Sequence, residues 1–283
     1  MNLRNLTART AIAGVATALA AGALVGVGTT AANAVENTTN YDCSAFGASQ
    51  GSFALKISTP VIPATATAGQ SFPANLLALD AQVTIPPATA GLLGSAQVNG
   101  GRIDDFKGSV GTTSLAAPLK FGAPVAQGDG SAIMTGAGAV GAFTLPKAGA
   151  YKVQLPSAFT FIPTNAAGDL AIGGTPVTVA CTSTAPGNLG DIKITKGAAT
   201  VKPKVKKVKK GYALTVAVTR TDSTIKPTGK VTAKFGKTKV TKSLKKGKAV
   251  LTLPKAAKGK KVKISYAGDA FVNGSKSSVK IKK

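Results

Sequence analysis

Histidine and tryptophan are absent from all 283 residues, and only ten residues are acidic. Without histidine the chain cannot form a Ser-His-Asp or Cys-His catalytic group, nor a zinc site with histidine ligands. A G-x-S-x-G element, a phosphate-binding loop and a dinucleotide fingerprint are missing as well. These absences exclude the most familiar enzyme classes, and we expect a non-catalytic protein with no cofactor and no bound metal.

Carboxylates are the one remaining route to catalysis, since many glycosidases use a pair of acids. Adjacent Asp104 and Asp105 would point to opposite faces of a strand and so do not form such a pair by themselves. Loop aspartates could also hold calcium, but their spacing matches no calcium-binding loop. A secreted hydrolase acting through the N-terminal part therefore stays an alternative, with five candidate acids: Asp80, Asp104, Asp105, Asp129 and Asp169.

The first residues have the pattern of an export signal. Arg4 and Arg9 precede an apolar, alanine-rich stretch over residues 11–27. After this stretch, Ala32-Asn33-Ala34 has the small-x-small form of a signal-peptide cleavage site. A membrane anchor is the alternative, because the stretch approaches the ~20 residues of a membrane span. We predict a signal peptide over residues 1–34, removal of that peptide, and a secreted or cell-wall-associated protein without a later transmembrane segment.

Cysteine is scarce, with only Cys43 and Cys181 in the whole chain. An exported chain meets oxidising conditions, so we predict that these two residues form a disulfide. The alternative is two unrelated buried thiols. Because the cysteines are far apart and no histidine is present, they do not indicate a metal site.

Charge divides the chain into two parts. Residues 35–190 carry six lysine and arginine residues and seven acids, whereas residues 191–283 carry 27 basic residues and three aspartates. The second part therefore has a net formal charge of +24. A turn-rich run over residues 185–190 separates the two, and we predict one domain on each side of it.

Short alternating runs predict β-strands throughout. In the near-neutral part they are separated by glycine, proline and other turn formers, which is typical of a sandwich or barrel. In the basic part apolar residues alternate with lysine or threonine, so each strand has one core face and one polar face. The sequence therefore predicts an all-β protein with two sandwich-like domains, the second built from about seven strands.

A family resemblance supports this prediction for residues 195–283. The run Tyr266-Ala267-Gly268-Asp269, followed by Phe271, Ser275 and Ser277, is similar to the ending of bacterial immunoglobulin-like repeat domains. That resemblance implies that Tyr266 ends a core strand and that Gly268 and Asp269 turn the chain into the last strand. It also implies a stalk or binding module of a surface or secreted protein. The segments Tyr41-Asp42-Cys43, Thr84-Ile85-Pro86, Leu155–Phe159 and Val179-Ala180-Cys181 resemble those of an uncharacterised domain of secreted actinobacterial proteins. That resemblance implies export and a β-rich fold, but no activity.

Lysine is the unusual feature of the basic domain. Such a charge favours binding to a polyanion through counterion release, and the partner we expect is an acidic cell-wall polymer or another polyanion, such as anionic lipid head groups or extracellular nucleic acid. Specific nucleic-acid recognition is disfavoured because Arg220 is the only arginine there. One alternative is a structural stalk whose lysines only maintain solubility; another is an antimicrobial or nucleic-acid-binding protein acting through charge alone. The sequence identifies no protein partner. The candidate contacts are Lys202, Lys204, Lys206, Lys207, Lys209, Lys210, Lys280, Lys282 and Lys283.

Overall fold

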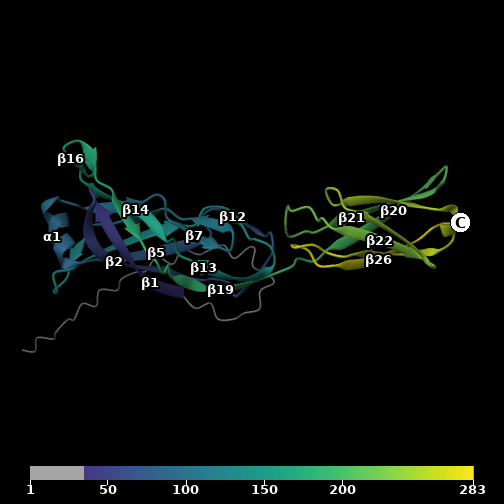
Figure 1. Ribbon diagram of the computed structural model, residues 1–283, viewed down its shortest axis with the longest axis horizontal. Coiled ribbons are helices and arrows are strands. Elements are labelled where there is room, and N and C mark those ends of the chain that lie inside the picture. Colours follow the sequence, from purple (N-terminus) through teal and green to yellow (C-terminus); the bar gives the residue numbers. More distant parts are fainter. Residues whose placement is uncertain (1–34, 283) are drawn as a thin grey trace, which may run out of the picture. The chain divides into compact units, whose positions relative to one another are not determined.

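The computed structural model describes residues 35–282, and Figure 1 shows that most of this part of the chain is β-strand. Its largest sheet has ten strands, eight of which close into a barrel-like ring of antiparallel neighbours. The ring runs in the order β11 (Ala132–Ala139), β5 (Ala78–Ile85), β2 (Ala48–Thr59), β1 (Val35–Ala45), β18 (Val179–Thr182), β14 (Ala158–Asn165), β6 (Gly100–Ile103) and β9 (Leu119–Phe121), and the two further strands are β10 (Val125–Ala126) and β15 (Gly168–Asp169).

Glycine allows the ring to close between β9 and β11. Gly136 and Gly138 of β11 lie opposite Phe121 and Leu119 of β9. A Cβ atom added at Gly136 would lie 2.5 Å from the carbonyl oxygen of Lys120. Only a residue without a side chain leaves room for this close approach of two backbones.

Alternation of apolar and polar residues decides which side of the ring is the inside. Phe53, Leu55 and Ile57 of β2 are buried, and the residues between them are partly exposed. Successive strand residues point to opposite faces, so these side chains enter the interior of the ring. The alternation seen in the sequence therefore corresponds to a core face and an outer face.

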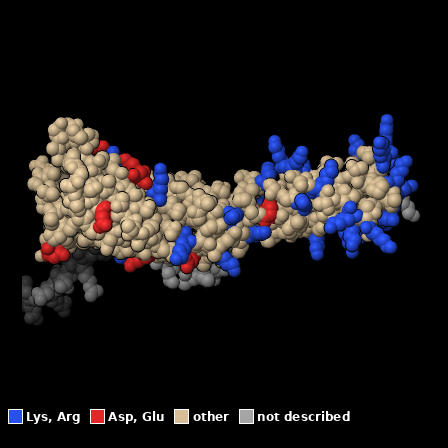
Figure 2. Space-filling view, in the orientation of Figure 1, with Lys and Arg blue, Asp and Glu red and all other residues tan. Residues whose placement is uncertain are grey.

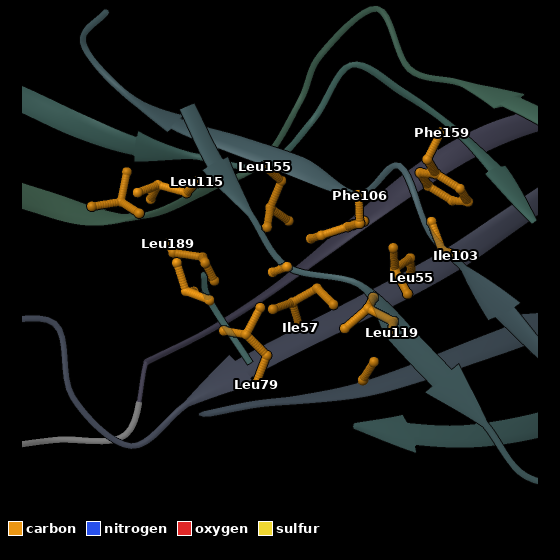
Figure 3. Close-up of a cluster of buried hydrophobic side chains, with 14 of the residues drawn as sticks. Leu55, Ile57, Leu79, Ile103, Phe106, Leu115, Leu119, Leu155, Phe159 and Leu189 are labelled. Carbon is orange, nitrogen blue, oxygen red and sulfur yellow. The ribbon is translucent and has the colours of Figure 1, made fainter. Parts of the chain in front are cut away.

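A second sheet covers part of this core. Figure 3 shows Leu189 from this sheet near Ile57 and Leu79 from the ring, and Leu115 and Leu55 belong to the same cluster. The two sheets share one hydrophobic cluster, so this part of the chain is sandwich-like as well as closed. The strands of the second sheet, in order, are β3 (Thr65–Thr67), β19 (Asn188–Thr195), β13 (Gly149–Gln154), β7 (Lys107–Val110) and β8 (Thr113–Ala116).

Short elements complete this first part. One helix, α1, follows β5, and four two-residue strands form two small antiparallel pairs. In Figure 1, α1 and β16 lie at the same end of the ring. Their bounds are α1 (Pro87–Ser95), β4 (Ser71–Phe72) with β12 (Phe143–Thr144), and β16 (Ala171–Ile172) with β17 (Thr175–Pro176).

The two cysteines form the predicted disulfide. Cys43 in β1 and Cys181 in β18 are direct register partners in the ring, and both are buried. They are separated by 138 positions in the sequence, so the bond joins the beginning and the end of the first part of the chain.

The basic part forms a seven-stranded, two-sheet sandwich with its own hydrophobic cluster. Inward residues such as Leu214, Val216, Leu251 and Ile264 are almost completely buried, as their alternation predicts. One sheet contains β20 (Thr200–Val208), β21 (Gly211–Thr219) and β24 (Lys248–Leu253); the other contains β23 (Thr238–Ser243), β22 (Lys230–Phe235), β25 (Lys261–Tyr266) and β26 (Ser275–Lys280), and a short 3-10 helix, η1 (Lys255–Ala257), follows β24.

The all-β, sandwich-like fold class predicted from the sequence is confirmed. The domain boundary at residue 190 stays a prediction; strand β19 continues across it to Thr195, and Ile192 and Ile194 belong to the first cluster. Within residues 35–282, no helix has the length and apolar character that crossing a membrane requires. The predicted signal peptide, with Ala32 and Ala34, lies outside the described residues, as does Lys283.

Candidate polyanion-binding surface

The lysines on β20 and on the turn that follows it are all exposed. Val201 is buried and Pro203 and Val205 are partly buried, so the residues that alternate with them point to solvent. Figure 2 shows blue side chains projecting over the part of the chain that Figure 1 colours green to yellow. The exposed lysines of this segment, which we call the β20 lysines, are Lys202, Lys204, Lys206, Lys207, Lys209 and Lys210.

The lysines of β20 lie opposite neutral residues of the neighbouring strand, β21. Lys202, Lys204 and Lys206 lie opposite Ala217, Thr215 and Ala213 of β21. On the other side of β21, Lys248 is the one charged residue of β24, and its side chain lies on the same outer face of the sheet. Across the strands of this sheet, the β20 lysines therefore lie opposite neutral residues and not opposite other lysines, which is the arrangement that solubility alone would favour.

The four-stranded sheet carries its lysines in a different arrangement. Lys234 of β22 lies directly opposite Lys239 of β23 on one side and Lys263 of β25 on the other. All three are exposed. The neighbours of Lys234 and Lys263 along their strands are buried, and Val240, beside Lys239, is partly buried against the same core. Residues directly opposite in antiparallel strands have Cβ atoms about 4.5–5.5 Å apart. We call Lys234, Lys239 and Lys263 the lysine row.

A second pair extends the row. Lys261, two residues from Lys263 on the same face of β25, lies opposite Lys280 of β26. Both side chains are exposed. Together with Lys230 of β22 and Lys276 of β26, seven exposed lysines thus lie on the outer face of this sheet, from all four of its strands. Lys280 was a candidate from the sequence; Lys282 is also exposed, two residues beyond it.

No acid neutralises these lysines within residues 35–282. The ion pairs of that range join Lys56 to Glu36, Arg102 to Asp104 and Asp169, and Arg220 to Asp222. A lysine row without carboxylate partners is destabilised by repulsion between like charges. Such an arrangement is suited to binding a multivalent anion, which would remove the repulsion.

The two aspartates of the sandwich have other partners. The Arg220 guanidinium donates two hydrogen bonds to Asp222, at 2.8 and 2.9 Å, and these lower the pKa of Asp222. Burial disfavours the ionised form of Asp269, but hydrogen bonds from Thr228, Phe271 and Val272 outweigh it and lower its pKa. Both carboxylates are therefore held in the ionised form by groups other than lysine.

The residues of the immunoglobulin-like resemblance form a turn. Tyr266 is the last residue of β25 and is buried, and Gly268 has a positive φ of 85°. A Cβ atom added at Gly268 would lie 2.8 Å from the carbonyl oxygen of Val272, so glycine is required there. Asp269 accepts hydrogen bonds from the backbone N–H groups of Phe271 and Val272 in the turn that leads to β26, and from that of Thr228 in the segment before β22.

The candidate acids of a hydrolase are engaged in local contacts. Asp104 and Asp169 both pair with Arg102, which lowers the pKa of Asp169, and hydrogen bonds from Ser131 lower the pKa of Asp129. Asp105 accepts a hydrogen bond from the N–H of Thr160, and Asp80 is exposed on β5. A general acid needs a raised pKa, and neither lowered carboxyl meets that need.

Metal ligands do not gather in the part of the chain that the structure describes. Within residues 35–282, no group of three or more histidine, cysteine, aspartate or glutamate side chains could hold a metal ion. The loop aspartates considered for calcium, Asp104, Asp105 and Asp129, have the partners given above.

The lysine row was missed by reasoning from the sequence. Alternation along residues 230–235 and 261–266 does place Lys234 and Lys263 on an outer face. Their juxtaposition depends on how β22, β23 and β25 pair, and the pairing of distant strands is not visible in one sequence. The β20 lysines were found because they are adjacent in the sequence, which is a weaker sign of a site.

Fold and surface together define an all-β protein with a disulfide-linked, closed first sheet and a cationic sandwich. Residues 40–192 match a family of unknown function, DUF6801, and the chain belongs to this family. The matched range covers the disulfide and ends within β19, so the cationic strands β20–β26 lie outside it. No curated protein matches the chain.

Proposed function

We propose that the protein is a secreted, non-catalytic component of a cell envelope or surface, and that its basic sandwich binds acidic polymers electrostatically. The observation that carries this proposal is the position of Lys234 directly opposite both Lys239 and Lys263. Like charges in direct opposition destabilise a sheet, and charges used for solubility alone are better placed opposite neutral residues, as the lysines of β20 are opposite β21.

Two features support an extracellular location. The Cys43–Cys181 disulfide is typical of proteins that mature under oxidising conditions. The seven-stranded sandwich and the turn built by Tyr266, Gly268 and Asp269 support the resemblance of residues 195–283 to bacterial immunoglobulin-like repeats. Modules of that kind present a surface, and their function resides in the residues on it.

Binding would depend on charge rather than on a shaped pocket. An anionic polymer lying across β22, β23 and β25 would contact several ammonium groups at once and release its condensed counterions. Lysine is a compact point charge, which suits phosphate groups without imposing a base sequence. Arg220, the one arginine of the sandwich, is occupied by Asp222 and is not free for bidentate recognition of a base.

The direct test is sedimentation of the purified protein with bacterial cell walls across a salt series, before and after acidic polymers are stripped from the walls. We expect binding that requires the acidic polymer and falls steeply with salt. A protein that stays in the supernatant even at low salt would favour the alternative, a structural stalk with a solubilising surface.

Two charge-matched variants separate a site from bulk charge. The triple variant Lys234→Thr, Lys239→Thr, Lys263→Thr removes the lysine row, and Lys202→Thr, Lys204→Thr, Lys206→Thr removes three β20 lysines. The slope of log K against log salt should fall by about 2–3 for the first variant, since each lost phosphate contact changes it by ~0.7–0.9. Equal losses in both variants would mean that net charge, and no particular surface, causes binding.

A further inference from the structure

An apolar cavity of about 600 Å³ opens at the end of the ring that carries α1. Its floor consists of Phe53, Ile85 and Phe161, which are buried side chains of the ring interior. Its walls come from α1, from the turn between β1 and β2, and from the β16–β17 hairpin. Small-molecule sites have volumes of about 300–1,000 Å³ and often lie at the mouths of β-barrels.

The cavity has no charged side chain among the residues that line it. Its three polar side chains, Gln50, Thr89 and Ser95, already donate hydrogen bonds to backbone carbonyl oxygens nearby. A polar or charged ligand would lose its hydration here and find few partners to replace it. The lining is therefore complementary to a hydrocarbon group.

Large apolar side chains surround the opening and are exposed to solvent. Phe46 is 65% exposed, Leu92 is 58% exposed and Ile172 is 60% exposed, and they come from three separate elements. Figure 2 shows this end of the ring, identified by α1 and β16 in Figure 1, as mostly free of charged side chains. Exposed apolar groups gathered around one cavity commonly mark a binding site.

Phe46 occupies a position that local turn chemistry disfavours. Phe46 and Gly47 form the two-residue turn between β1 and β2, and their φ angles are 52° and 77°. Two positive φ values define the type I′ hairpin turn, whose first position strongly prefers asparagine, aspartate or glycine. A bulky aromatic residue at positive φ carries a conformational cost and gains no burial from the chain, so its ring has another use.

We propose that this cavity binds the hydrocarbon chain of a single-chain amphiphile, with the chain on the floor formed by Phe53, Ile85 and Phe161 and the head group outside. The Phe46 ring would cover the entering chain at the rim. A peptide is a poorer fit, because the lining offers only the remaining hydrogen-bonding capacity of Gln50, Thr89 and Ser95 to its many backbone polar groups. This site involves no lysine and does not depend on the function proposed for the sandwich.

Titration calorimetry with octyl, decyl and dodecyl maltoside, below their micelle-forming concentrations, tests the proposal. These probes are uncharged, so the lysines do not contribute, and maltose serves as the head-group control. We expect saturable binding of one chain per protein, with affinity rising up to about fourfold per added methylene until the cavity is full. Maltose should not bind.

Two substitutions locate the binding. Phe46→Asn suits the type I′ turn and should leave the unfolding temperature unchanged or raised, but it should weaken dodecyl maltoside binding by about fivefold or more. Val125→Asn, at an exposed residue of β10 that does not line the cavity, should leave binding unchanged. Binding that ignores chain length, that is equal in both variants, or that occurs only with phosphatidylcholine vesicles would overturn the proposal.

Discussion

Lys234 of β22 and Lys263 of β25 are direct register partners in the two central strands of the four-stranded sheet. Lys239 adds a third ammonium group on the other side of Lys234. This arrangement opposes folding and favours an anionic ligand for the same reason, which is the repulsion between neighbouring positive charges. Stability and binding should therefore respond in opposite directions when the row is changed.

Replacing Lys234 by threonine should stabilise the protein. The change removes two like-charge pairs, each costing about 0.2–1 kcal/mol on the scale of cross-strand interactions. Urea unfolding of Lys234→Thr at 20 mM and 500 mM NaCl should show a gain that shrinks with salt, because salt screens exposed charges. Lys204→Thr is the matched control, since Lys204 faces the neutral Thr215. Equal gains in both variants would contradict a specific effect of the row.

Removal of the disulfide should destabilise the first part of the chain. The double variant Cys43→Ser, Cys181→Ser frees two adjacent strands of the ring, and loss of a native disulfide typically costs about 2–5 kcal/mol. Guanidinium unfolding, monitored separately for the disulfide-linked part and the sandwich, would measure this cost. The sandwich contains no cysteine, so its own unfolding should be insensitive to reducing agent.

Closure of the ring should depend on Gly136. In Gly136→Val the new side chain would meet the carbonyl oxygen of Lys120, so β9 and β11 would have to separate, at a cost of about 1–3 kcal/mol or more. Gly128→Ala is a suitable control, because a Cβ atom there meets nothing within 4 Å. Hydrogen exchange should show faster exchange in β9 and β11 of the valine variant alone.

Acid should weaken the sandwich through Asp222 and Asp269. Both carboxyls have a lowered pKa in the folded protein, so each contributes stability that is fully present above its unfolded pKa of about 3.9. That stability is lost as the pH falls through the lower, folded pKa. The variant Asp222→Asn should therefore show a flatter loss of stability in acid than the unchanged protein, measured by urea unfolding from pH 7 downward.

The variant Asp222→Asn should also differ in stability from the unchanged protein at neutral pH. Asn at position 222 keeps the size of the side chain but removes the charge that pairs with Arg220. The variant should be less stable than the unchanged protein at pH 7, and the difference should narrow below pH 4. A difference that stays constant with pH would mean that the Arg220–Asp222 contact contributes through packing rather than charge.

Alternation along single strands made much of the fold predictable. Val216 and Ile264 could be assigned to the core because one apolar face per strand is visible in the sequence. The disulfide could be predicted because only two cysteines are present. Closure of the first sheet could not be predicted, because it depends on the close approach of β9 to β11 at Gly136. In a sequence with many glycines in turns, nothing distinguishes a glycine that permits such a contact between strands.

The candidate sites depended even more on tertiary structure. Lys239 and Lys263 are 24 positions apart, and only the strand order β23-β22-β25 brings both beside Lys234. The apolar cavity draws on α1 and on two hairpins, and Phe46 and Ile172 belong to it only because those hairpins meet at one end of the ring. Alternation in a single sequence shows which face of each strand is apolar, whereas the pairing of strands determines which residues lie beside one another.

The closed ring also bears on whether neighbouring copies of the protein can aggregate by pairing their strands. A sheet that closes between β9 and β11 leaves few unpaired backbone groups along its length, and β20, at an edge of the sandwich, carries Pro203 and several lysines. Neighbouring copies would therefore find little opportunity to add a strand along the ring or at β20. Dense coating without fibre formation is the behaviour that this architecture permits.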